Sequence, residues 1–246
     1  MQDFKLLDAL ACDRVFALYF TGYKDRQPHF VEELQRVGVG SGQVQSIWQY
    51  PDPYNAWEME CLPHIQFLAH QRGIGIWSAS KAHYAALATA YELGCRSVLI
   101  MEDDCRFVKD LSVLQKSLER APDNWDVLML DHFQPQGPIR LVNDCWTQCI
   151  ASGSTACYAV NRKAMERFIR MYESAVKGNY RRPCLRACDQ WTDTRYLGND
   201  INFYCATPNL AVQCTMPGPS NCGRLHCEAK YKSIHVDLND YAGYSR

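Results

Sequence analysis

The chain has 246 residues, of which 47% are hydrophobic and 22% are charged, and its formal net charge is −1. This composition is ordinary for a globular fold, and a chain of this length can bury about three quarters of its unfolded surface. The near-zero charge argues against a dedicated nucleic-acid binder, whose affinity would depend on excess Lys and Arg.

The first half of the chain alternates predicted strands and helices, a pattern typical of a largely parallel sheet covered on both faces. The order of elements is a strand at 14–20, a helix at 28–37, a strand at 44–49, a helix at 57–71 and a helix from Ser78 or Ser80 to Gly94. Pro28 suits a first helical turn, and Gly38 and Gly94 are typical residues after a helix end.

The next strand, beginning at Ser97, is apolar and ends in three consecutive carboxylates, Glu102, Asp103 and Asp104. Open α/β sheets bind ligands beyond the carboxyl ends of their strands, and clustered carboxylate oxygens there suit Mg²⁺ or Mn²⁺ carrying substrate phosphates. The alternative is an acidic turn that caps a helix at 111–120. Because neighbouring side chains on an extended segment point opposite ways, we expect Glu102 to point with Asp104.

The second half begins with a buried strand at 125–130 that places Asp131 and His132 at its carboxyl end. The polar stretch 133–144 contains Pro135, Gly137 and Pro138, which is typical of a loop, either a mobile substrate loop or an inert surface loop. An amphipathic helix is expected at 162–176.

The chain contains 13 cysteines, an odd number that argues against a complete disulfide framework. The start of the chain has no signal-peptide pattern, and no apolar run reaches the roughly eighteen residues of a membrane span. We therefore expect a cytoplasmic protein with reduced thiols. Three pairs leave a zinc staple open as an alternative: Cys145/Cys149, Cys184/Cys188 and Cys222/Cys227, the last with His226 beside it.

Several separated segments match one family in order. They are the strand 15–20 followed by Asp25 and Arg26; Ala82 and His83; Glu102, Asp103 and Asp104 followed by Arg106 and Phe107; 153–160; Cys188, Asp189 and Gln190; and Tyr204 to Pro208 with Val212 and Gln213. Over roughly residues 14–221 the chain resembles glycosyltransferase family 25, which includes bacterial lipopolysaccharide and procollagen galactosyltransferases.

The resemblance implies one GT-A-type, Rossmann-like α/β domain with a mixed, mainly parallel sheet and helices on both faces. Residues 14–131 would bind the nucleotide sugar, 132–221 would bind the acceptor, and 222–246 would form a tail. The implied reaction is metal-dependent, inverting transfer of galactose or glucose from a UDP-sugar to a hydroxyl of a glycan or of hydroxylysine. A lipid-linked acceptor would bring the protein into peripheral contact with a membrane.

The resemblance also assigns roles to residues. Asp189 would be the general base, although it also suits the N-cap of a following helix. Glu102 and Asp104 would hold Mn²⁺ or Mg²⁺, with His226 as third ligand and His235, Asp131 or His132 as alternatives. Asp103 would bind the donor ribose or sugar, and the other donor-binding residues would be Tyr19, Thr21, Arg26, His83, Ser154 and Thr155.

Two other functions remain open from the sequence. One is a non-catalytic relative that keeps the fold as a binding or adhesion module. The other is a Mg²⁺-dependent nucleotidyltransferase, which would also use carboxylates at strand ends. Residues 21–24 are a poor match to the Gly-rich, Lys- or Arg-bearing loop expected of that enzyme after its first strand.

Overall fold

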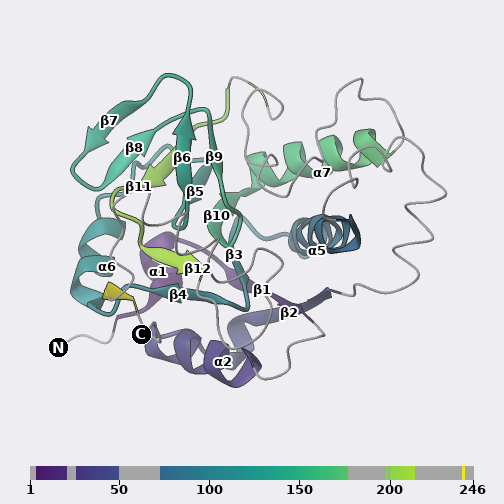
Figure 1. The fold of residues 1–246 in the computed structure, drawn as a ribbon, viewed down its shortest axis with the longest axis horizontal. Coiled ribbons are helices and arrows are strands. Elements are labelled where there is room, and N and C mark those ends of the chain that lie inside the picture. Colours follow the sequence, from purple (N-terminus) through teal and green to yellow (C-terminus); the bar gives the residue numbers. More distant parts are fainter. Residues whose placement is uncertain are drawn as a thin grey trace.

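A computed structural model describes residues 4–20, 26–49, 73–176, 198, 200–213 and 240–241 of the chain. Within them lies an eight-stranded sheet with the order β2-β1-β3-β10-β5-β11-β8-β7 (Figure 1). Its strands are β1 (Arg14–Phe20), β2 (Val44–Gln49), β3 (Ser97–Glu102), β5 (Val127–Met129), β7 (Arg140–Asn143), β8 (Trp146–Gln148), β10 (Cys157–Asn161) and β11 (Phe203–Ala206). Strands from both predicted halves of the chain therefore share one sheet.

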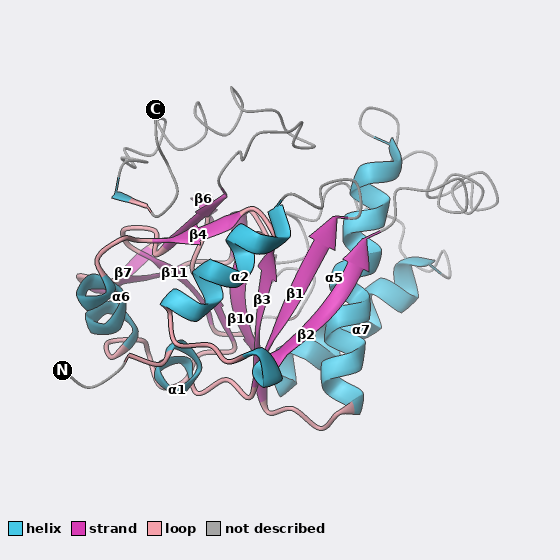
Figure 2. Ribbon diagram, turned by 90° about the horizontal axis from the view of Figure 1, so that it is seen from below, coloured by secondary structure: helices cyan, strands magenta, loops and turns pink. Residues whose placement is uncertain are grey.

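The sheet is mixed. β1 pairs in parallel with β2 and β3, and β11 pairs in parallel with β5. β10 is antiparallel to both of its neighbours, and β8 is antiparallel to β11 and β7. Because β1, β2 and β3 are parallel, their carboxyl ends lie at the same edge of the sheet (Figure 2).

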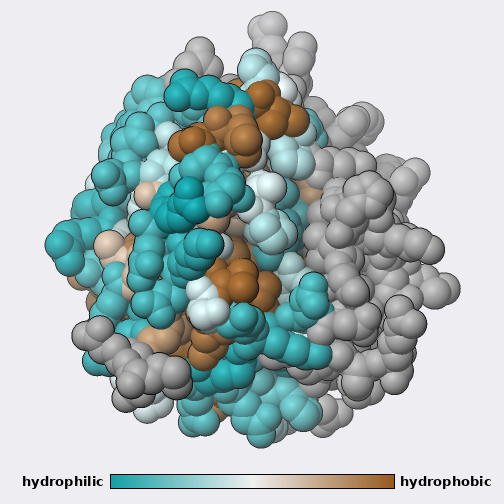
Figure 3. Space-filling model, turned by 90° about the vertical axis from the view of Figure 1, so that its left-hand side faces the viewer, coloured by the Kyte–Doolittle hydropathy of each residue, from teal (hydrophilic) through white to brown (hydrophobic). Residues whose placement is uncertain are grey.

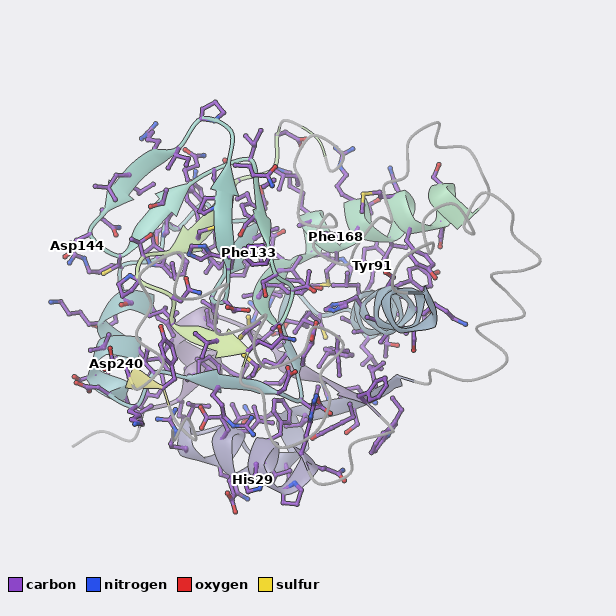
Figure 4. The ribbon with its side chains drawn as sticks, in the orientation of Figure 1. His29, Tyr91, Phe133, Asp144, Phe168 and Asp240 are labelled. Carbon is purple, nitrogen blue, oxygen red and sulfur yellow. The ribbon has the colours of Figure 1, made fainter. Side chains whose placement is uncertain are left out.

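Helices cover both faces of the sheet. One face packs on α1 (Leu6–Leu10), α2 (Arg26–Arg36) and α6 (Leu111–Leu118), and the other packs on α5 (Gly73–Glu92) and α7 (Arg162–Val176). Tyr91 of α5 and Phe168 of α7 lie on the same side of the sheet (Figure 4). β3 is apolar almost throughout because a strand covered on both faces has no solvent side. This arrangement confirms the predicted fold class, a Rossmann-like α/β sheet between two layers of helices.

The structure moves the start of one predicted helix, and another predicted helix falls on residues that it does not describe. α5 begins at Gly73 rather than at Ser78 or Ser80. Gly73 and Gly75 are weak helix formers, but the buried alanine face of the later turns stabilises the helix through packing. The helix expected at 57–71 lies outside the described residues.

The stretch 133–144 is not a loop. It forms β6 (Phe133–Gln136), which pairs with β9 (Ala151–Gly153), and β7, which pairs with β8. Gly137 makes the turn between them with a positive φ of 84°. Pro135 is compatible with β6 because that strand belongs to a two-stranded ribbon rather than to the centre of a sheet.

β7 forms an edge of the large sheet and exposes apolar side chains. Ile139, just before the strand, is 59% exposed and Leu141 is 67% exposed, and apolar patches interrupt the polar surface on this side of the molecule (Figure 3). None of the helices in the described part of the chain combines the length and the apolar character needed to cross a membrane.

Candidate functional site

Glu102 ends β3, and Asp103 and Asp104 form the turn to β4 (Cys105–Phe107); the three carboxylates together are called the acid turn below. The backbone of the turn is tied to two neighbouring elements. The amide of Glu102 donates to the carbonyl of Ala156 at 2.8 Å, and the amide of Asp103 donates to the carbonyl of Leu18 in β1 at 3.0 Å. The acid turn is therefore fixed at the carboxyl edge of the parallel strands.

Arg26 joins two of the three acids. Its Nη1 lies 3.2 Å from Oδ1 of Asp103 and 3.3 Å from Oδ2 of Asp104, and all three side chains are buried. The amide of Phe20, at the end of β1, donates to Oδ2 of Asp103 at 3.0 Å. The first turn of α2 and the end of β1 thus hold Asp103 in place.

Glu102 and Asp104 share a second partner, Gln213. Nε2 of Gln213 lies 3.3 Å from Oε2 of Glu102 and 3.3 Å from Oδ2 of Asp104. Gln213 reaches this position because β12 (Ala211–Gln213) pairs with β4. Glu102 and Asp104 therefore converge on Gln213, as predicted, and Asp104 also shares Arg26 with Asp103.

Asp104 is the most unusual member of the turn. It is 3% exposed, and its Oδ1 is buried without any hydrogen-bond partner. Burial, reinforced by the negative charge of Glu102 and opposed by Arg26, raises the pKa of Asp104 to about 8. Burial also raises the pKa of Asp103, against the opposing effects of the Phe20 amide and Arg26.

The chemistry of this cluster fits a hard divalent cation. Mg²⁺ and Mn²⁺ take oxygen ligands and commonly bind through one or two carboxylates together with substrate phosphates. Glu102 and Asp104 would supply the carboxylates, and the partnerless Oδ1 of Asp104 is a lone acceptor of the kind a cation satisfies. Gln213 could present its amide oxygen after a flip of the amide group.

The structure limits the choice of further ligands. Among the described residues, no group of three His, Cys, Asp or Glu side chains is arranged to hold a metal ion. His226 and His235 lie outside the described residues. Of the nearer alternatives, Asp131 is fully buried and accepts hydrogen bonds from Ser154 and Asn209, and Nε2 of His132 lies 2.6 Å from the carbonyl of Ala206.

His83 lies behind Glu102. Its Nε2 is 3.3 Å from Oε1 of Glu102, and its Nδ1 is 3.1 Å from the hydroxyl of Tyr158. Thr155 donates to the same Oε1 of Glu102 at 3.3 Å. Because His83 is only 2% exposed, these contacts make it a group that orients the carboxylate of Glu102.

Ser154 occupies a strained position beside this network. Its φ is +80°, a value that residues other than Gly rarely adopt, and its hydroxyl donates to the buried carboxylate of Asp131. Asn209 donates to the other oxygen of Asp131 at 3.3 Å. Asp131 therefore holds the small-residue segment that precedes β10 close to the acid turn.

Tyr19 belongs to an aromatic cluster at the ends of β1 and β2. Its ring stacks on Trp48, with centroids 5.1 Å apart, and meets Phe30 edge to face at 5.5 Å. Burial and the nearby charge of Asp103 raise the pKa of Tyr19. Trp48 is 40% exposed, so one aromatic surface at this edge of the sheet faces solvent.

One alternative from the sequence is wrong. The acid turn does not cap α6, because the side chain of Asp110 accepts the amide of Ser112 at 2.8 Å and caps that helix. The zinc alternative stays a prediction, because Cys184/Cys188 and Cys222/Cys227 lie outside the described residues, among which Cys145 and Cys149 belong to no group of three metal-binding side chains. Sγ of Cys149 lies 3.4 Å from Sγ of Cys205.

The structure thus brings together Arg26, Glu102, Asp103 and Asp104, with His83 and Thr155 in contact with Glu102. Thr21 and Asp189 lie outside the described residues, so their predicted roles stay predictions. Sequence reasoning did not place Gln213, Arg106 or Trp48 in the site. Gln213 depends on a strand pairing across more than a hundred residues, which no local pattern indicates.

Comparisons with known proteins leave the family open. No family model matches the chain, and no curated protein matches it. Among solved structures, the chain is similar to the crystal structure described as mannose-1-phosphate geranyltransferase from Thermus thermophilus, with 10% identity and a TM-score of 0.40 over 78% of this chain and 73% of that chain. A similarity of this size carries no conclusion about ligand or reaction.

Proposed function

We propose that the protein is a metal-dependent, inverting hexosyltransferase of the GT-A type, related to glycosyltransferase family 25. It would move galactose or glucose from a UDP-sugar to a hydroxyl of a glycan or of hydroxylysine. The observation that carries this proposal is the convergence of Glu102 and Asp104 at the carboxyl end of β3, where Oδ1 of Asp104 is buried without a partner.

The transfer reaction develops negative charge on the leaving group, and the site must stabilise that charge. The acceptor hydroxyl attacks the anomeric carbon, the bond from that carbon to the diphosphate breaks, and the leaving diphosphate takes the electron pair. A divalent ion held by Glu102 and Asp104 would neutralise the charge that develops there. Arg26 keeps Asp103 and Asp104 together before any ligand binds, so the carboxylates are preorganised at little further cost.

Other groups would orient the donor. Asp103, fixed by Arg26 and the Phe20 amide, would accept a hydrogen bond from a ribose or sugar hydroxyl. His83 and Thr155 would hold Glu102 in its ligand orientation. The segment at Ser154 would let the donor sugar approach the backbone, because it carries only small side chains.

The acceptor side rests on the resemblance. Inversion needs a base that takes the acceptor proton, and Asp189 is the proposed base. His226 is the proposed third metal ligand. Both residues lie outside the described part of the chain, so these two assignments draw their support from the sequence.

The decisive test is product analysis. With UDP-galactose or UDP-glucose and Mn²⁺, the purified protein should release UDP, slowly with water and faster with a suitable hydroxyl acceptor. Asp110→Asn is the matched control, because Asp110 is an exposed acid that caps α6 and should not affect turnover. Release of pyrophosphate from a nucleoside triphosphate and a hexose phosphate, with no UDP release from UDP-sugars, would instead identify a nucleotidyltransferase.

A further inference from the structure

Arg106 in β4 is a buried cation with an unused donor. The residue is 2% exposed, and its Nη1 donates to the carbonyl of Cys105 at 2.6 Å, with the carbonyl of Asp103 at 3.5 Å. Its Nη2 is buried and has no hydrogen-bond partner. Among the described residues, no carboxylate forms an ion pair with Arg106.

Two nearby arginines, unlike Arg106, form ion pairs with carboxylates. Arg26 is paired with two carboxylates of the acid turn. Arg36 places Nε and Nη2 on the carboxylate of Glu33, and its guanidinium also donates to the carbonyls of Phe107, Val108 and Lys109. Arg36 is therefore saturated with protein partners around β4, whereas Arg106 within that strand is not.

Burying a guanidinium with an N–H group that has no acceptor costs free energy, unless a ligand accepts a hydrogen bond from that group. The planar guanidinium is well suited to phosphate oxygens, which accept charge-assisted hydrogen bonds from it. Since Nη1 lies against the backbone of residues 103 and 105, the unused Nη2 belongs to the same turn that presents Glu102 and Asp104. The acid turn thus carries carboxylates that suit a cation, and the adjoining β4 carries a buried donor that suits an anion.

We propose that Arg106 is a diphosphate-binding residue, whose Nη2 donates to a phosphate oxygen of the ligand that the acid turn binds. The proposal deepens the proposed function and rests on it for the identity of the ligand as a nucleotide sugar. In that setting Arg106 binds the diphosphate both before and after the glycosyl bond breaks, and its charge stabilises the leaving group.

Calorimetric titration with inorganic pyrophosphate, UDP and uridine, each with and without Mn²⁺, tests the proposal. Arg106→Gln should weaken binding of pyrophosphate and of UDP by about tenfold or more, because it removes a charge-assisted hydrogen bond, and it should leave the affinity for uridine unchanged. Arg106→Lys keeps the positive charge but lacks the Nη2 group, so it should recover part of the affinity for pyrophosphate and UDP.

Thermal unfolding separates this role from a structural one. Arg106→Gln should leave the Tm of the ligand-free protein unchanged or higher, because it removes an uncompensated buried charge. The control Arg36→Gln should lower the Tm and leave pyrophosphate binding intact, because Arg36 is bound only to protein groups. Unchanged affinity of Arg106→Gln for pyrophosphate and UDP, or a loss of folding comparable with Arg36→Gln, would overturn the proposal.

The two proposals fail in different ways. If wild type binds UDP-sugars and Arg106→Gln binds them equally well, the glycosyltransferase proposal stands and the role of Arg106 is wrong. If pyrophosphate binds through Arg106 while no UDP-sugar binds, the anion site stands and the proposed donor is wrong.

Discussion

Asp104 carries the strongest chemical signal at the scale of single residues. Natural folds rarely leave a carboxylate oxygen buried and without a partner, because an unsatisfied buried acceptor costs free energy. In Asp104 this cost is not relieved by Arg26 or Gln213, both of which contact the other oxygen. A buried, unsatisfied carboxylate oxygen that packing does not explain is typical of a residue that binds a ligand.

The raised pKa of Asp104 predicts how stability depends on pH. Its pKa is about 8 in the folded protein against an ordinary value of 3.8. Between these values the folded state keeps a proton that the unfolded chain has released, so the stability contributed by Asp104 falls as pH rises through this window. The amide side chain in Asp104→Asn does not titrate, so its contribution to stability does not change with pH.

The Tm of Asp104→Asn minus that of wild type should therefore increase from about pH 4 to about pH 8 and level off above it. Differential scanning calorimetry of the ligand-free proteins at a series of pH values measures this difference, with Asp110→Asn as control. A difference that stays constant across the window would show that Asp104 titrates normally.

Asp189 offers a second prediction at the residue scale, based on the sequence. Asn caps a helix about as well as Asp, so Asp189→Asn should cost little stability, whereas Asp189→Ala should cost about 1 kcal/mol if the residue is a cap. Loss of a general base typically lowers the rate by about a hundred- to ten-thousand-fold. Both variants should therefore lose turnover while keeping donor and metal affinity. Asp189→Asn that keeps more than about a tenth of wild-type turnover would move the base elsewhere.

At the scale of elements, the link between α2 and β4 positions the acid turn. Glu33 of α2 is 4% exposed, and its carboxylate accepts the amide of Phe107 at 2.7 Å as well as the guanidinium of Arg36. The same helix carries Arg26 at its start, so the contact fixes Arg26 relative to the acids.

Glu33→Ala should destabilise the protein by about 2 kcal/mol, because it leaves the buried amide of Phe107 without an acceptor. Glu32→Ala on the same helix is the control, because the Glu32 side chain is 75% exposed. Its effect should stay within about 0.5 kcal/mol. Urea denaturation of both variants checks the prediction, and equal stabilities would show that Glu33 does not anchor α2.

The elements also show which parts of the fold a sequence can predict. β1, β3 and α7 follow from local hydrophobic pattern, and the structure has them at or close to the predicted residues. β6 and β7 were missed because Pro135, Gly137 and Pro138 are typical of loops, whereas pairing with β9 and β8 overrides that preference. The pairing of β12 with β4, which brings Gln213 to the acids, depends on tertiary contacts alone.

At the scale of the whole molecule, the sheet brings distant segments to one edge. The end of β1, the start of α2, the acid turn after β3 and the end of β12 come from widely separated parts of the sequence and meet around Asp103 and Asp104. The acids and Arg26 could be predicted from the strand-end motif and the family resemblance. Arg106 and Gln213 lie in segments that match the family, but their burial and their contacts with the acid turn depend on strand pairing, which the sequence does not report.

The central claim is that the acid turn binds a nucleotide sugar together with a divalent ion. Titration of the protein with UDP-galactose and UDP-glucose, with and without Mn²⁺, tests it most directly, with Asp104→Asn and Asp110→Asn measured in parallel. The account predicts that wild type and Asp110→Asn bind one of these sugars only when Mn²⁺ is present, and that Asp104→Asn loses this binding while remaining folded. Equal, metal-independent binding by wild type and Asp104→Asn, or no binding of either UDP-sugar by wild type with Mn²⁺, would contradict it.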